Sequence, residues 1–156
     1  MKAILSLYGS AIGYEDGELI KTHKDDFTHF KNITKDMVVV MGRKTVDTLP
    51  CKLKDRKVLC LSRSLTQHPY ADEVVDFWDI TSGYATGDVI IAGGSEVYDK
   101  FAGLVTEAYV TIWKHVELKD KPLVKLSDRF LAKLSGMQYD VYQEHEEFTI
   151  YHYYGG

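Results

Sequence analysis

The chain has 156 residues, a net charge of -4 and 19 basic residues scattered along the sequence. This length is usual for one domain and suffices to bury roughly two thirds of the unfolded surface in a single core. The scattered charges form no basic stripe for a nucleic-acid backbone, and no run approaches the roughly 18 apolar residues that span a bilayer. We therefore expect one domain over residues 1–156, with no nucleic-acid or membrane partner and a monomer as the simplest assembly.

The first apolar run, Lys2–Leu7, lies just before Gly9. It is only about five apolar residues long and no plausible cleavage site follows it, so we interpret it as a buried strand and not as a signal peptide. Two cysteines, Cys51 and Cys60, occur in a chain too large to need disulfides for stability. We expect both thiols to be free and the protein to be cytoplasmic.

Short apolar runs alternate with amphipathic segments along the chain, which predicts parallel strands joined by helices. The runs VVVM and VIIA do not alternate in polarity, as is typical of strands buried on both faces. The segment MQYDVYQEHEEFTIYHYY alternates around an acidic turn and predicts a closing hairpin. We expect an α/β fold with a mostly parallel twisted sheet, an antiparallel C-terminal hairpin and about four helices. The clearest strands are Lys2–Leu7, Met37–Met41, Lys57–Ser62, Asp88–Ala92 and Glu107–Lys114, and the clearest helices are Lys24–Ile33, Arg43–Leu49 and Ser95–Phe101.

Two adjacent carboxylates, Asp25 and Asp26, stand at the start of the helix expected over Lys24–Ile33. One carboxylate at this position is ordinary capping, a role that Asp25 can fill. Asp26 precedes Phe27, with Phe30 one turn later, so its carboxylate can instead face an apolar pocket. There it would make paired hydrogen bonds to the amidine-like edge of a heterocycle, and desolvation would raise its pKa. The residues alone favour a second, solvent-exposed capping acid.

The segment Val38–Pro50 passes from a strand through a glycine into a helix that begins with Arg43–Thr45. Cations at a helix N-terminus oppose the macrodipole, so two of them suggest an external anion such as a dinucleotide. The pair Ser62–Arg63 closes the next strand, where ligands gather in open parallel sheets, and offers a hydroxyl and a guanidinium to a ribose phosphate. The alternative interpretation of the Arg43–Thr45 segment is a solvated surface turn.

A third strand, within Ile90–Phe101, ends in the pair Gly93–Gly94 and leads directly into a helix. Adjacent glycines let backbone N–H groups approach an anion closely, and the helix start adds partial positive charge, a geometry that suits a pyrophosphate. A strand-to-helix turn also needs glycine merely to turn. The residues alone leave both interpretations open.

Metal and nucleophile motifs are missing from the sequence. The six histidines show no HExxH spacing and the two cysteines form no CxxC pair, so we expect no metal site. There is no Walker motif, no GxGxxG and no GxSxG elbow. His145, which stands among Glu144, Glu146 and Glu147, is interpreted as part of a solvated hairpin turn.

Taken together, in this order and at these spacings, the segments resemble the dihydrofolate reductase family along nearly the full chain. MGRKT followed by AGGSEVY and YVT is a specific combination. The resemblance implies a single domain of that family over 1–156, with an adenosine-binding subdomain at roughly 37–104. The matching residues are Ile12–Gly13, Asp26, Phe27, Phe30, Met41–Thr45, Thr48–Pro50, Leu53, Arg56, Leu61–Arg63, Gly93–Gly94, Val97–Tyr98 and Tyr109–Thr111.

The resemblance implies a substrate site around one carboxylate. Asp26 would hydrogen-bond the 2-amino group and N3 of a pterin while the Thr111 hydroxyl braces it, and these two are the expected catalytic residues. Arg56 would pair with the α-carboxylate of the glutamyl tail of the folate, a bidentate contact that Lys reproduces poorly. The other expected substrate contacts are Leu7, Phe27, Phe30 and Leu49.

The resemblance also implies NADPH as the cofactor. The glycine pair and the Arg43–Thr45 turn would hold the pyrophosphate, and Ser62 and Arg63 would hold the 2′-phosphate. Hydride would pass from nicotinamide C4 to pterin C6, with a proton reaching N5 from water, and convert 7,8-dihydrofolate to tetrahydrofolate. The expected cofactor contacts are Ile12, Gly42, Arg43, Lys44, Thr45, Ser62, Arg63, Ala92, Gly93, Gly94, Ser95, Glu96, Val97 and Tyr98.

The sequence departs from the family in the lengths of the Leu7–Ala11 segment and of the following loop, in the composition of that loop and at Ala92. The loop after Gly13 usually carries a Pro-Trp pair that closes over the nicotinamide and holds a water, whereas Leu19–Lys21 stands there here. Ala92 replaces a larger aliphatic residue and leaves extra volume near the pterin and the nicotinamide. Two alternatives therefore stay open: a pyrimidine or pteridine reductase of the same fold, against which Asp26 and Arg56 count, and a folate- or nucleotide-binding module with weak catalysis.

Overall fold

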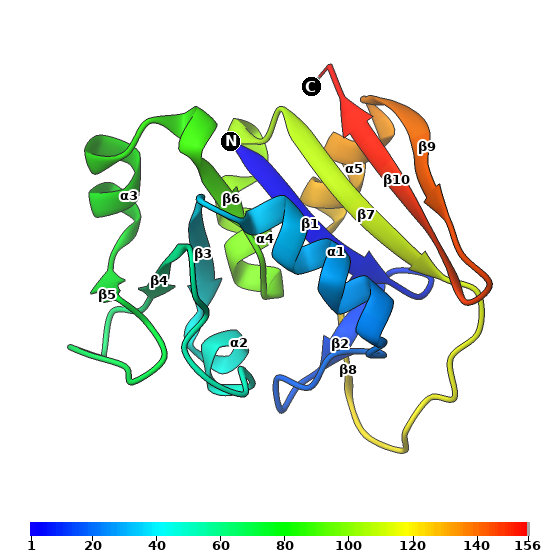
Figure 1. The fold of residues 1–156 in the computed structure, drawn as a ribbon, viewed down its shortest axis with the longest axis horizontal. Coiled ribbons are helices and arrows are strands. Elements are labelled where there is room, and N and C mark those ends of the chain that lie inside the picture. Colours follow the sequence, from blue (N-terminus) through cyan, green and yellow to red (C-terminus); the bar gives the residue numbers. More distant parts are fainter. Residues whose placement is uncertain (156) are drawn as a thin grey trace.

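A single mixed sheet of eight strands organises residues 1–155, the part of the chain that the computed structural model describes (Figure 1). Its order is β5-β4-β3-β6-β1-β7-β10-β9, and a separate two-stranded sheet pairs β2 with β8. The strands are β1 (Lys2–Leu7), β2 (Ala11–Tyr14), β3 (Val38–Gly42), β4 (Lys57–Leu61), β5 (Glu73–Val75), β6 (Val89–Ile91), β7 (Glu107–Trp113), β8 (Leu123–Lys125), β9 (Gln138–Glu144) and β10 (Phe148–Tyr154).

Strands β5, β4, β3, β6, β1 and β7, which are neighbours in this order, pair in parallel. Strand β10 pairs antiparallel with β7, and β9 pairs antiparallel with β10. Helices cover both faces, because the apolar strands have no polar face to show to solvent. This confirms the expected α/β fold with an antiparallel C-terminal hairpin. The α-helices are α1 (Lys24–Thr34), α2 (Arg43–Asp47), α3 (Phe77–Gly83), α4 (Ser95–Phe101) and α5 (Asp128–Ser135), with 3-10 turns η1 (Thr86–Asp88) and η2 (Ala102–Leu104).

Alternation along the strands divides the core between the two faces. Ile4 and Met41 point to the face covered by α1 and α2, where Phe30 packs against the same cluster. Leu5 and Val40 point to the opposite face, where they join residues of α3, α4 and α5. Each central strand therefore contributes to two clusters, as its unbroken apolar sequence predicts.

Two helices and three short strands are absent from the sequence expectation. Helix α3 begins with a complete capping box, in which Asp76 accepts from the Asp79 amide and Asp79 accepts from the Asp76 amide. Helix α5 begins at Ser127, whose side chain accepts from the Phe130 amide. Both signals are present in the sequence. Strands β2, β5 and β8 have four, three and three residues, too few for periodicity to mark them.

The start of α1 differs from the expectation for Asp25. The capping residue is His23, whose side chain accepts from the Asp25 amide, so the Asp25 carboxylate is free for other contacts.

The thiols of Cys51 and Cys60 are free, as expected. Within residues 1–155, no helix is both long and apolar enough to cross a bilayer.

His29 is a buried ionisable residue of α1. It is 6% exposed and lies between Tyr109 and Tyr142, with ring centroids 5.9 and 5.6 Å away. Desolvation lowers the pKa of His29 from 6.5 to about 4. Its Nε2 atom has no hydrogen-bond partner among residues 1–155. The neutral ring is therefore the form that the fold accommodates.

His29 should make stability depend on pH. Because the pKa is lower in the folded chain, the unfolded chain binds more protons between pH 6.5 and 4. Stability is complete above pH 6.5 and falls as pH drops towards 4, by up to about 3 kcal/mol. Denaturant unfolding across this range should show a shallower loss in His29→Phe than in the wild type. Parallel pH profiles would contradict this account.

Candidate active site

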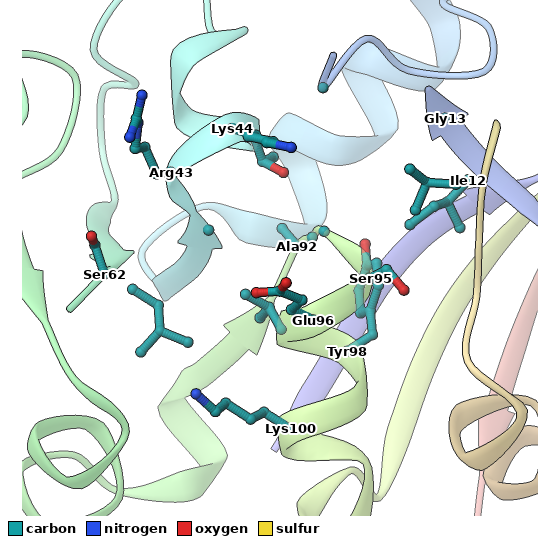
Figure 2. A pocket seen from close by; sticks show the side chains of 18 of the residues that line it. Ile12, Gly13, Arg43, Lys44, Ser62, Ala92, Ser95, Glu96, Tyr98 and Lys100 are labelled. Atoms are coloured by element: carbon teal, nitrogen blue, oxygen red, sulfur yellow. The ribbon is translucent and has the colours of Figure 1, made fainter. Parts of the chain in front are cut away.

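A large open cavity lies at the carboxyl ends of β3, β4 and β6, with a volume of about 1090 Å³. Figure 2 shows Ser62 and Arg43 on one side, Ile12 and Gly13 on the other, and Ala92 with the start of α4 between them. In open parallel sheets, ligands bind beyond the carboxyl ends of the strands. The lining includes every expected cofactor contact, namely Ile12, Gly42, Arg43, Lys44, Thr45, Ser62, Arg63, Ala92, Gly93, Gly94, Ser95, Glu96, Val97 and Tyr98.

Close backbone contact between two strand ends forms the floor of the cavity. The amide of Gly42 donates to the Gly93 carbonyl over 2.8 Å. Gly93 has a φ of +114°, and a Cβ there would lie 3.3 Å from the Thr45 hydroxyl. Gly42 and Gly94 are the capping residues of α2 and α4, and neither helix start has a side-chain cap. Within residues 1–155, the first-turn amides of both helices therefore receive no side-chain cap.

Tyr98 anchors α4 to the central strand. Its hydroxyl donates to the Ile4 carbonyl over 2.7 Å, and burial raises the pKa of the phenol far above its ordinary value. The side chain is 4% exposed, so only a small part of it reaches the cavity. Tyr98 therefore fixes the position of the α4 N-terminus relative to β1.

Several polar groups around the cavity already have partners within the chain. Arg43 Nε lies 3.7 Å from Asp47 Oδ2, and Lys44 Nζ donates to the Glu15 carbonyl over 3.2 Å. The Ser62 hydroxyl accepts from the amides of Ser64 and Leu65, which fixes the turn after β4. The contacts of Arg43 and Lys44 are solvent-exposed, so an anion can compete for these cations at low cost.

The cavity lining also includes residues that the sequence does not predict as cofactor contacts, among them Lys100, Ser64 and Trp78. Lys100 projects from α4 and Ser64 follows Arg63, while Trp78, at 74% exposure, stands at the start of α3. Figure 2 shows Lys100 on the opposite side of the cavity from Lys44. Lys100 and Ser64 adjoin segments that the sequence already marks, whereas Trp78 stands in no motif and reaches the cavity only through the fold.

The loop after β2 borders the cavity on the side of Ile12. A Cβ on Gly13 would lie 2.4 Å from the Glu18 carbonyl, so only glycine fits the close turn. Ile20 is buried beside Trp113, and Lys21 Nζ donates to the His115 carbonyl over 2.9 Å. The segment that replaces the family's Pro-Trp pair is thus tied down by its own contacts.

Asp26 lies in the first turn of α1 and faces the sheet. Its Oδ1 accepts from the Thr111 hydroxyl over 2.7 Å, and Thr111 is 2% exposed. Desolvation raises the pKa of Asp26, an effect that the Thr111 hydrogen bond and the nearby His23 oppose in part. Within residues 1–155 no Lys or Arg forms an ion pair with this carboxylate.

Asp25 has the opposite environment. Its side chain is 46% exposed, and a hydrogen bond with His145 lowers the pKa of Asp25. His145 is accordingly not a free solvated turn residue, since its Nε2 lies 2.9 Å from Asp25 Oδ2 and its ring stacks on Phe148 with centroids 4.2 Å apart. Of the two neighbouring carboxylates, Asp26 is the one turned towards the sheet.

The other expected substrate contacts lie outside the large cavity. Phe27 is 41% exposed and stacks on Phe30, with centroids 6.2 Å apart, while Phe30 and Leu49 pack on the cluster beneath α1 and α2. Arg56 is partly buried, and its Nε has no partner within residues 1–155. Leu7 packs in the cluster on the opposite face of the sheet, away from Asp26.

The side chain of Ser6, next to Leu7, points to the other face of the sheet, the one that carries Thr111. It pairs in register with Thr111 on the neighbouring strand β7 and also lines the cavity. Side chains of parallel neighbours in register share a face, so Ser6 lies between the cavity and the Thr111–Asp26 pair. Alternation from buried Ile4 is the signal that could have identified it.

Comparisons with known proteins agree with this geometry. The family model described as dihydrofolate reductase matches residues 7–149. Dihydrofolate reductase type 8 of Escherichia coli is 30% identical over 103 residues, which are 60% of this chain and 61% of that protein. Dihydrofolate reductase of Mycoplasma genitalium is 28% identical over 140 residues, 83% of this chain and 82% of that protein. The chain thus spans about 61% of the first of these relatives.

A solved structure shares the fold. Dihydrofolate reductase from Enterococcus faecalis, complexed with NADP(H) and RAB-propyl, superposes with a TM-score of 0.75 at 18% identity. The match covers 98% of this chain and 94% of that one.

The backbone at Gly93 gives a stability prediction. Gly93→Ala places a side chain in the left-handed region and 3.3 Å from the Thr45 hydroxyl, so it should lower the free energy of unfolding by about 1–3 kcal/mol. The matched control is Gly87→Ala, where a Cβ meets nothing within 4 Å. Urea unfolding of the two variants measures the difference, and equal midpoints would contradict the close-contact account.

Proposed function

Because the chain belongs to the dihydrofolate reductase family, we propose that it reduces 7,8-dihydrofolate to tetrahydrofolate with NADPH. One observation carries this proposal: Ser6 and Thr111 lie side by side and connect the desolvated Asp26 carboxylate to the large cavity. In this proposal, a site for a heterocycle adjoins a site for a long anionic cofactor at the carboxyl ends of the strands.

The cavity fits a dinucleotide. Its floor is the backbone contact between Gly42 and Gly93, where a Cβ on Gly93 would crowd the Thr45 hydroxyl. Within residues 1–155, the starts of α2 and α4 lack side-chain caps. Backbone amides in such positions bind phosphate oxygens. Arg43, Lys44 and Lys100 would add positive charge around the pyrophosphate, and Arg63 with Ser62 would hold the 2′-phosphate. When NADPH is bound, it supplies the hydride.

Asp26 orients the substrate in this proposal. Its carboxylate would accept hydrogen bonds from the 2-amino group and N3 of the pterin, with the Thr111 hydroxyl holding the other side of the carboxylate in place. No competing cation pairs with it in residues 1–155, so its charge is available to the ligand. We propose that water delivers the proton to N5, and that Phe27, Phe30, Leu49 and Arg56 contact the rest of the folate.

The setting proposed for the reaction follows from the same residues. We propose that the protein works as a cytoplasmic monomer without a nucleic-acid partner, supported by the free thiols of Cys51 and Cys60 and by the net charge of -4. Size-exclusion chromatography with light scattering tests the monomer.

Spectrophotometry of the purified protein tests the reaction. NADPH absorbance should fall only when dihydrofolate is added, and methotrexate should stop the fall. Tight binding of NADPH and methotrexate without turnover would favour the binding module, whereas turnover of a pyrimidine or another pteridine in place of dihydrofolate would favour the other reductases of this fold.

Asp26→Asn should lower kcat for dihydrofolate by roughly 10²–10³-fold, because the neutral amide cannot replace an anion aimed at the pterin edge. The matched control is Asp128→Asn, which removes an exposed carboxylate from the first turn of α5. Steady-state kinetics of both variants decide the point. An unaffected Asp26→Asn enzyme would assign the role to another residue.

Arg63→Ala should raise KM for NADPH by about 10–100-fold and leave KM for NADH nearly unchanged, because only NADPH carries the 2′-phosphate. Arg129→Ala, an exposed arginine on α5, serves as the control for lost surface charge. An equal rise in KM for NADPH and for NADH in Arg63→Ala would show that this guanidinium does not bind the 2′-phosphate.

A further inference from the structure

Three metal-ligating side chains meet where α1 begins near the turn between β9 and β10. We propose that His23, Asp25 and His145 form a binding site for a divalent transition-metal ion of the zinc class. Each residue offers one ligand atom, and these atoms lie within 4.8 Å of one another. The site stands apart from the large cavity, and the proposal is independent of the proposed reductase activity.

The separations suit a small tetrahedral ion. Asp25 Oδ2 lies 2.9 Å from His145 Nε2 and 3.8 Å from His23 Nδ1. Zinc–nitrogen bonds of about 2.0–2.1 Å in tetrahedral geometry place ligand atoms roughly 3.4 Å apart, between these two distances. Small side-chain rotations therefore complete a set of two imidazoles and one carboxylate. A water would take the fourth position.

The surrounding contacts hold both rings ready for an ion. His23 Nε2 lies 2.7 Å from Glu147 Oε2, so a carboxylate fixes the ring through the nitrogen that faces away from Asp25. Histidines that bind metals typically have this outer carboxylate. His145 is held by its stacking on Phe148, at an interplanar angle of 3°. Glu147 is itself 3.6 Å from Lys21 Nζ, which limits its freedom.

The hydrogen bonds that binding displaces define the class of ion. The amide of Asp25 donates to His23 Nδ1, and the amide of Glu147 donates to His145 Nδ1, both over 3.0 Å. An ion must take the lone pair of His23 Nδ1 and move the His145 ring proton from Nε2 to Nδ1, which releases both amides. Only ions with strong affinity for imidazole offset this loss, which favours Zn²⁺, Cu²⁺ or Ni²⁺ over Ca²⁺ and Mg²⁺.

Sequence spacing gave no indication of this site. Asp25 and His145 are 120 positions apart, and each stands among charged residues that suggest a solvated surface. Strand β10 pairs with β7, the strand that also contacts the start of α1 through the Thr111–Asp26 hydrogen bond. This pairing brings the turn between β9 and β10 close to the start of the helix. Their proximity is a product of topology alone.

Calorimetric titration of tag-free, chelator-treated protein with Zn²⁺ tests the proposal. We expect one equivalent to bind, and Co²⁺ in its place to give the visible absorption of a four-coordinate site. Asp25→Asn and His145→Ala should each lower Zn²⁺ affinity at least tenfold, and Glu147→Gln by about 10–100-fold. Asp25→Asn keeps the size of the side chain, so it tests the ligand without removing packing.

His68→Gln is the matched control. His68 repeats the local pattern, with Nε2 2.7 Å from Asp47 Oδ1 and Nδ1 accepting from the Tyr70 amide, but no second histidine stands beside that pair in residues 1–155. It should bind Zn²⁺ as the wild type does, and so should Cys51→Ser, which lacks the exposed thiol. Absence of binding to the wild type, or unchanged affinity in Asp25→Asn and His145→Ala, would overturn the assignment.

Discussion

The hydrogen bond from the Thr111 hydroxyl to Asp26 Oδ1 joins helix α1 to the strand beside the centre of the sheet. It holds a carboxylate against the sheet with no cation to neutralise it in the described chain, and desolvation raises the pKa of that carboxylate. Holding a desolvated, unpaired carboxylate lowers the free energy of unfolding, and such a cost is expected where the carboxylate binds a ligand. The rest of the site is consistent with that use, because Ser6 beside Thr111 opens onto the large cavity.

The cavity follows from a constraint on the backbone. The end of β3 touches the end of β6 through Gly42 and Gly93, and α2 and α4 start from that contact. Two uncapped helix starts then face the same space, with exposed cations around it. Through Ser6 and Thr111 the desolvated carboxylate adjoins the cavity that has this amide-rich floor, an arrangement that suits the proposed hydride transfer between two bound molecules.

Much of this arrangement is predictable from sequence, and the misses have physical causes. The long apolar strands β1 and β7 and the glycine-led helix α4 were assigned nearly to the residue, because burial on both faces leaves a strong pattern. Short strands such as β8 carry no such pattern, and α3 and α5 are marked in the sequence only by their capping residues, Asp76 and Ser127. For Asp25 and Asp26, sequence alone could not tell which carboxylate turns inward. Strand alternation places Ser6, and not the expected Leu7, on the face of Thr111, and the His145 contact depends on topology that no local segment encodes.

The central claim is that the Asp26 carboxylate holds the pterin ring. Calorimetric titration of folate into protein saturated with NADP⁺ tests it without relying on turnover, in the wild type and in Asp26→Asn. The account predicts that the wild type binds folate and that Asp26→Asn binds at least about tenfold more weakly, the effect of losing a charge-assisted pair. Equal affinity in the two proteins would contradict it.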